Sequence, residues 1–259
     1  MEYIDSTVTL TQQTVVISDT GREEREETLA IEVPYKVALN DREIGASMVL
    51  ATALEEFGAG FLFGQGYITE PGQVREVLVC PEGRISVHAD VEEGSEPKEV
   101  IVTSGCGGTG KISREMLEGA FDPLQEATIT MAEIHTFILR VLHGSELSNQ
   151  THCVHGCGLW AHGKLQAFYE DVGRHNAVDK IIGAILLGKI PADGAVYTTG
   201  RLTSDMVLKC GRIGIPIVMS RTAPSSLGLA IARRAGVTLV GYARPGRLNV
   251  FNAPERIHR

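Results

Sequence analysis

Strand-like and helix-like segments alternate through the second half of the chain, and this rhythm limits its fold more than any other feature. Short apolar runs at 195–199, 216–219 and 237–242 are separated by helix-like stretches near 204–212 and 225–235. Such alternation is typical of a parallel or mixed sheet covered by helices. We therefore predict an α/β fold for this half.

The first part of the chain is dominated by strand-like segments instead. They are rich in β-branched and apolar residues and lie at 7–17, 29–39, 74–79, 85–91 and 99–103. Thr52 with Glu55, and Thr130 with Glu133, match the capping box and predict two helix starts. We expect a strand-rich (α+β) N-terminal domain over 1–125 and a second domain over 126–259.

The charge is distributed unevenly between the two parts. The chain has 24 basic and 32 acidic side chains, which gives −8; residues 1–139 carry 9 basic and 25 acidic ones, and residues 140–259 carry 15 and 7. The basic surplus would attract anions such as phosphates. The acidic half could form a surface for a protein partner. The alternative is that its Glu-rich stretches at 23–27 and 92–99 are only solvated turns. Nucleic acid is not favoured, because the chain is acidic overall and has no basic run with interleaved aromatics.

Several features argue for a cytoplasmic protein. No apolar run approaches the ~18 residues that a membrane span needs. The start, Met1-Glu-Tyr-Ile-Asp5, is acidic and unlike a signal peptide. Five cysteines cannot all pair with one another, so thiol chemistry in a reducing compartment is expected before disulfides.

The glycine-rich segment 103–111 contains Cys106 and permits two chemical interpretations. Gly105-x4-Gly110-Lys111 is most of a phosphate-binding P-loop, but Ile112 stands where Ser or Thr should hold magnesium. Alternatively, Cys106 is a reactive thiol, favoured as thiolate by Lys111 and a nearby helix start. A plain turn with an incidental cysteine is the third interpretation.

Three further segments are rich in polar groups. His152-Cys-Val-His-Gly-Cys157 invites a zinc site, but no second ligand pair stands at a suitable distance, so a packed helix start with buried thiols is favoured. In segment 170–180, Arg174 and His175 at a helix start suit an anion, with a salt-bridged cap as the alternative. Segment 242–247 sets two arginines around a Pro-Gly turn after a strand, where a diphosphate could be held.

Together these segments resemble the formate dehydrogenase accessory sulfurtransferases, the FdhD family. The resemblance runs from Leu54 to Arg256, and its most specific parts are the 170–180 string and the Cys106 loop. The 199–204 segment and the 242–247 turn add to it. It implies a sulfurtransferase that takes persulfide sulfur from a cysteine desulfurase and passes it to the molybdenum (or tungsten) centre of a bis-pterin guanine dinucleotide cofactor for formate dehydrogenase. It also implies a homodimer and no structural metal.

The same resemblance assigns residues and a fold. Cys106 matches the persulfide-carrying cysteine. The cofactor segment corresponds to Tyr242, Ala243, Arg244, Pro245, Gly246 and Arg247, and we add Arg174 and His175 as anion-binding candidates. The C-terminal domain is expected to be a cytidine-deaminase-like mixed sheet sandwiched by helices, without zinc chemistry.

One departure from the family pattern concerns the Cys106 loop. The family commonly has Cys-x-x-Cys there, whereas this chain has Thr109 at the second position. Carriage of sulfur needs only one thiolate, so that function survives. Release of the sulfur then needs a reductant, the metal, or another thiol such as Cys153 or Cys157. The alternative function is a non-catalytic chaperone that delivers the molybdenum cofactor.

Overall fold

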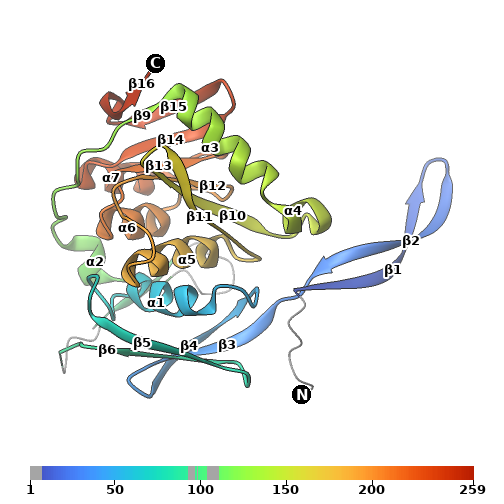
Figure 1. Ribbon diagram of the computed structural model, residues 1–259, viewed down its shortest axis with the longest axis horizontal. Helices are drawn as coiled ribbons and strands as arrows, with labels where there is room; N and C mark the ends of the chain where they lie inside the picture. Colours follow the sequence, from blue (N-terminus) through green and yellow to red (C-terminus); the bar gives the residue numbers. More distant parts are fainter. Residues whose placement is uncertain (1–7, 93–96, 98, 104–110) are drawn as a thin grey trace.

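The computed structural model describes residues 8–92, 97, 99–103 and 111–259, and its larger layer is a six-stranded mixed sheet (Figure 1). The strand order is β11-β10-β12-β13-β14-β15. The strands are β10 (His155–Ala161), β11 (Lys164–Asp171), β12 (Ala195–Thr198), β13 (Ile217–Ser220), β14 (Thr238–Arg244) and β15 (Arg247–Asn252). β12, β13 and β14 are parallel, and the outer pairings are antiparallel.

Helices cover both faces of this sheet, which confirms the predicted α/β class. They are α3 (Met131–His143), α4 (Glu146–Thr151), α5 (Arg174–Leu186), α6 (Ser204–Arg212) and α7 (Ser226–Ala235). Side chains alternate across a strand. Val196 and Val218 therefore join one core with α5 and α6, while Tyr197 and Met219 join a second core under α3.

A second sheet, with strand order β4-β3-β6-β5, is built by the N-terminal part. Its strands are β3 (Val33–Leu39), β4 (Arg42–Val49), β5 (Val74–Cys80) and β6 (Arg84–Ala89). Helix α1 (Leu54–Gly64) lies between this sheet and α5 (Figure 1). One hydrophobic core includes residues of both halves, and the boundary at 125 stays a prediction.

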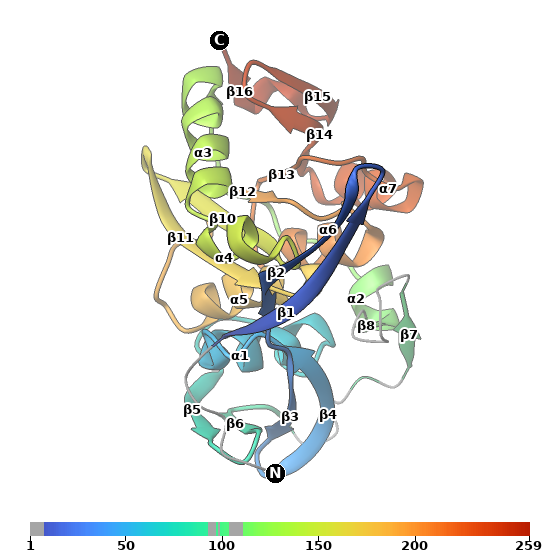
Figure 2. The same cartoon turned by 90° about the vertical axis from the view of Figure 1, so that its right-hand side faces the viewer.

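The remaining elements are short, except for a ribbon that stands out from the molecule. Strands β1 (Thr9–Ser18) and β2 (Gly21–Ala30) pair with each other over their full length (Figures 1 and 2). The short elements are β7 (Val100–Val102), β8 (Lys111–Ser113), α2 (Arg114–Glu118), β9 (Ile129–Thr130), the 3-10 turn Pro254–Arg256 and β16 (Ile257–His258). None of the helices in the described residues is long and apolar enough to cross a membrane.

Several local predictions need correction. Glu23 to Glu27 are not turns: they form part of β2, because their backbone pairs with the Thr- and Gln-rich β1. Thr52 does not cap α1, whose N-cap is Ala53; the Thr52 hydroxyl instead accepts from the Lys180 ammonium at 3.3 Å. The Thr130–Glu133 capping box is confirmed. Residues 152–157 lead into strand β10, not into a helix.

Candidate functional site

The segments singled out in the second half of the chain converge on one edge of the six-stranded sheet. The carboxyl ends of the parallel strands β12, β13 and β14 lie there, and ligands of α/β sheets bind at such edges. The antiparallel register brings His155, at the start of β10, opposite Asp171, at the end of β11. Arg247 begins β15 opposite Arg244 at the end of β14. We call this edge the carboxyl edge.

The Cys106 loop itself lies outside the described residues, but its two flanks are described. Val102 pairs with Lys111 across β7 and β8, so the flanks of segment 104–110 lie side by side. Lys111 to Ser113 form a strand, and helix α2 begins only at Arg114. A P-loop lysine stands at a helix start to meet phosphate. The P-loop interpretation is therefore wrong.

Thr103, the last described residue before the loop, contacts the starts of α5 and α6 through Asp205. Its hydroxyl donates to the Asp205 Oδ2 at 3.0 Å, and His175 Nε2 lies 2.5 Å from the same oxygen. The Thr203 hydroxyl donates to Asp205 Oδ1 at 2.5 Å. Burial opposes ionisation of this carboxyl, but His175, with Thr203 and Lys209, outweighs burial and lowers its pKa. Asp205 thus joins the flank of the Cys106 loop to His175.

Arg174 and His155 lie beside this contact. Arg174 is buried against Gly200, where an added Cβ would come within 2.8 Å of the arginine side chain. His155 Nδ1 lies 3.2 Å from the Thr199 hydroxyl. Burial lowers the pKa of His155, and the charges of Arg174 and His175 lower it further. The structure therefore brings the predicted Arg174 and His175 together with His155.

Other charged residues of the 170–180 string are structural. Lys180 Nζ lies 2.8 Å from Asp171 Oδ2, and Lys209 Nζ lies 2.8 Å from Asp179 Oδ1, with all four side chains buried. Burial lowers the pKa of Lys180 and raises that of Asp179, while each partner opposes the shift. The salt-bridged alternative thus holds for part of the string, and the anion-site interpretation of Arg174 and His175 stays a prediction.

The 242–247 segment forms the end of β14, a Pro245-Gly246 turn and the start of β15. Tyr242 is 45% exposed in a left-handed conformation (φ 52°), and its amide donates to the Thr222 carbonyl at 3.0 Å. Ala243 is buried, whereas Arg244 and Arg247 are exposed. Gly246 supplies the positive φ (78°) that the turn requires.

Two further arginines, Arg201 and Arg221, follow β12 and β13 at the same edge, and the sequence analysis did not select them. Both are exposed, as are Arg244 and Arg247. Within the described residues, no carboxylate lies within ion-pair distance of these four guanidiniums. Their positions, each just after or beside a strand's carboxyl end, are the signal that could have found them. Four such guanidiniums suit a diphosphate.

The described thiols differ in reactivity. Burial raises the pKa of Cys157 well above its usual value, with Cys210 and Asp179 adding to the shift. Burial likewise raises the pKa of Cys210 to about 12. Cys153 is exposed, so of these three it alone has access to a partner. No group of three or more His, Cys, Asp or Glu side chains suited to a metal occurs in the described ranges.

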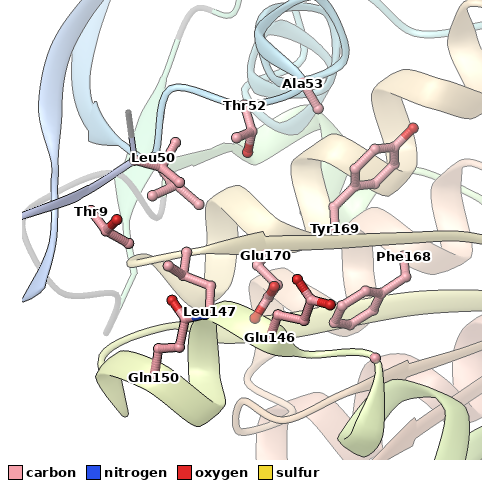
Figure 3. Close-up of a pocket in the computed structure, with 12 residues that line it drawn as sticks. Thr9, Leu50, Thr52, Ala53, Glu146, Leu147, Gln150, Phe168, Tyr169 and Glu170 are labelled. Carbon is pink, nitrogen blue, oxygen red and sulfur yellow. The ribbon is translucent and has the colours of Figure 1, made fainter. Parts of the chain in front are cut away.

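A separate cavity of about 530 Å³ lies between β11, α4, the start of α1 and the start of β1, from which Thr9 lines it (Figure 3). Figure 3 shows Glu146 and Glu170 near Phe168, with Leu147 and Leu50 on the other side. Its ionisable lining groups are these two carboxylates and the Tyr169 phenol. Because its charged groups are acidic, this cavity is unsuited to phosphates, unlike the carboxyl edge.

Comparisons with known proteins agree with this arrangement. The FdhD/NarQ family model matches residues 30–258. Proteins named sulfur carrier protein FdhD are 32% identical in Sulfolobus acidocaldarius (93% of this chain, 95% of that protein) and in Wolinella succinogenes (90% and 84%). A crystal structure from Desulfotalea psychrophila, assigned as a formate dehydrogenase accessory protein, is 60% identical with a TM-score of 0.87 over 97% of this chain and 100% of that one. The chain therefore belongs to the FdhD/NarQ family.

Proposed function

We propose that this protein is a sulfur carrier that takes persulfide sulfur from a cysteine desulfurase on Cys106 and transfers it to the molybdenum (or tungsten) centre of a bis-pterin guanine dinucleotide cofactor, as formate dehydrogenase requires. The names of the relatives support sulfur carriage and the link to formate dehydrogenase. The reduced thiol that this chemistry needs favours a cytoplasmic location.

The observation that carries the proposal is the contact between Thr103 and Asp205. Thr103 stands three positions before Cys106, and its hydroxyl bonds to a carboxylate that also contacts His175. The flank of the loop is thereby held at the carboxyl edge, the same edge that carries the exposed arginines Arg201, Arg221, Arg244 and Arg247. A sulfur-bearing loop and an anion site on one edge are what a transfer to a phosphate-bearing cofactor needs.

The chemistry of loading balances with a single thiol. The Cys106 thiolate attacks the outer sulfur of the donor's cysteine persulfide; a new S–S bond forms at Cys106, and the donor cysteine leaves as a thiolate. No net oxidant is consumed, so Thr109 in place of a second cysteine does not block this step. The buried Cys157 is a poor candidate for releasing the sulfur, because its thiol is held protonated.

The guanine dinucleotide cofactor, the substrate in this proposal, would be held by segment 242–247, whose tyrosine and arginines are exposed, with Arg201 and Arg221. Guanidiniums bind diphosphates through paired hydrogen bonds, and the Tyr242 ring is exposed for stacking on a base. Buried Arg174 would add positive charge beneath this surface, next to His175. We further propose that 126–259 is the cytidine-deaminase-like, cofactor-binding unit, and that the protein acts as a homodimer.

The proposal is tested by intact mass after incubation with a cysteine desulfurase and cysteine. Wild type should gain one sulfur atom, lost again with a reductant, and Cys106→Ala should gain none. Activation of formate dehydrogenase should also fail with Cys106→Ala. If that variant still activates the enzyme and wild type takes up no sulfur, the protein is a cofactor-delivering chaperone instead.

A further inference from the structure

The ribbon of β1 and β2 contacts helix α4 at its base, and from there it projects away from the rest of the chain with exposed residues on both faces (Figure 1). Its two strands have ten residues each and pair only with each other among the described residues (Figures 1 and 2). A two-stranded ribbon alone is marginally stable in water. The β1–β2 ribbon therefore needs contacts with another surface to keep its two strands paired over their full length.

Apolar side chains lie on both faces of the ribbon. Ile17 is 77% exposed and Val15 43%, and because they are two residues apart they share one face. Leu10 (53%) and Leu29 (45%) pair across the strands on the opposite face. Large exposed apolar groups gathered on one element mark an interaction surface. A partner that binds the ribbon would therefore have to cover both of its faces to bury these side chains.

We propose that the ribbon clasps the C-terminal domain of a second copy of this chain. Its charged residues are five acidic (Asp19, Glu23, Glu24, Glu26 and Glu27) and two basic (Arg22 and Arg25), so it is negative, whereas residues 140–259 carry 15 basic and 7 acidic side chains. The same chain thus bears both complementary surfaces. The base of the ribbon lies against α4 of its own chain, where Thr9 lines a cavity with Glu146. Its own domain does not cover the part near the turn, because Val15 and Ile17 stay exposed there and the ribbon projects outward (Figure 1).

The size of the ribbon fits such an interface. A stable protein interface uses about 20–30 residues on each side. In a two-fold dimer each copy would contribute its ribbon of 20 strand residues together with the surface that receives the partner's ribbon. The proposal identifies the surface behind the homodimer of the proposed function. It is tested without any sulfur donor, so its failure is separate from failure of the sulfur chemistry.

The test is sedimentation equilibrium of the full chain, comparing wild type with the double variant Val15→Lys, Ile17→Glu. Val15 faces Glu24 and Ile17 faces Arg22 across the ribbon, so both new charges meet an opposite charge and the ribbon keeps its pairing. The matched control is Leu78→Glu, Val79→Lys, which changes two exposed apolar residues of β5 with the same net charge. Circular dichroism and a thermal melt check that each variant folds.

Wild type should be a dimer, and the ribbon variant should raise the dimer Kd at least about tenfold, because it replaces two apolar side chains of the interface with charged ones that resist burial. The control should leave Kd unchanged, and added salt should weaken the wild-type dimer. A monomeric wild type, or a dimer that the ribbon variant leaves intact, would overturn the proposal.

A second measurement does not depend on charged substitutions. A photoreactive benzoylphenylalanine in place of Ile17 should cross-link two chains, and in a mixture of isotopically heavy and light protein the linked peptides should join 17 of one copy to residues 140–259 of the other. Cross-links that stay within one chain, or that form only with added desulfurase or formate dehydrogenase, would contradict a second copy as the occupant.

Discussion

The hydroxyl of Thr103 and the carboxylate of Asp205 are joined by a 3.0 Å hydrogen bond although 102 residues separate them in the chain. Thr103 directly follows strand β7, which ends at Val102, and Asp205 lies in the first turn of α6. Because Asp205 also contacts His175 at the start of α5, this one carboxylate connects three elements. The predictions about loading of sulfur follow from that connection.

Removing the Thr103 hydroxyl should loosen the flank of the loop. Thr103→Val keeps the shape but removes the donor to a buried carboxylate, so the free energy of unfolding should fall by about 1.5–3 kcal/mol. The rate of persulfide formation on Cys106 should fall as well. Thr103→Ser, which keeps the hydroxyl, should restore both values. Denaturant unfolding and time-resolved intact mass measure the two effects, and equal behaviour of Val and Ser would refute the role of the hydrogen bond.

Asp205→Asn should lower the free energy of unfolding by about 3 kcal/mol or more, because it removes the negative charge that balances the buried groups around it. Its lowered pKa also predicts a pH dependence. The carboxyl binds a proton more readily in the unfolded chain, where the pKa is about 3.9. Its stabilisation is therefore present above that pH and lost as the pH falls towards the folded pKa. Between about pH 5 and 2, the free energy of unfolding should fall less steeply with decreasing pH for Asp205→Asn than for wild type.

The sequence predicted the parts of the fold that depend on local pattern. The strands and helices from Ala195 to Ala235 lie within a residue or two of their expected bounds, because each has an apolar period and a turn signal of its own. β2 was missed, since its Glu-rich sequence becomes a strand only by pairing with β1. The predicted helix cap at Thr52 was wrong for a similar reason, because the Thr52 hydroxyl accepts a hydrogen bond from Lys180, which is distant in sequence.

The candidate site was predicted in outline but not in its connections. Arg174, His175 and the 242–247 turn follow strand ends on the same edge of the sheet, and their role as one binding site stays a prediction. Asp205 and Lys209 could not be found from local pattern, because their partners His175 and Asp179 lie thirty residues earlier. For the same reason the sequence could not separate buried ion pairs of the 170–180 string from its site residues.

The arginines of the carboxyl edge should bind guanosine diphosphate. Arg244→Ala and Arg247→Ala should each raise the Kd about tenfold or more, because a charge-assisted hydrogen bond contributes about 1.5–3 kcal/mol. Arg233→Ala is the matched control, since it removes an exposed arginine from the last turn of α7, away from this edge. Isothermal titration calorimetry measures the affinities. Equal losses with all three variants would mean that only overall charge matters.

The burial of two thiols predicts a pattern of alkylation. With iodoacetamide at neutral pH, Cys157 and Cys210 should stay unmodified in the folded protein, because burial raises the pKa of both. Cys153 is exposed and should react. Peptide mass spectrometry before and after unfolding in urea gives the comparison. Cys157→Ala should leave sulfur uptake intact, and loss of uptake in a folded Cys157→Ala protein would give that thiol a role in transfer.

The close packing of α1 on α5 depends on two glycines. A Cβ on Gly60 would lie 1.9 Å from the Asp179 carbonyl oxygen, and one on Gly183 would lie 1.7 Å from that of Glu56. Since the obstacles are backbone atoms, the helices must separate, and α5 carries Arg174, His175 and the buried ion pairs. Gly60→Ala should therefore lower the free energy of unfolding by about 1–3 kcal/mol or more, as overpacking does, and weaken binding at the carboxyl edge. Gly45→Ala is the control, because its Cβ would meet only the Phe61 ring at an ordinary 3.5 Å. A Gly60→Ala protein as stable as Gly45→Ala would show that the two helices can move apart without cost.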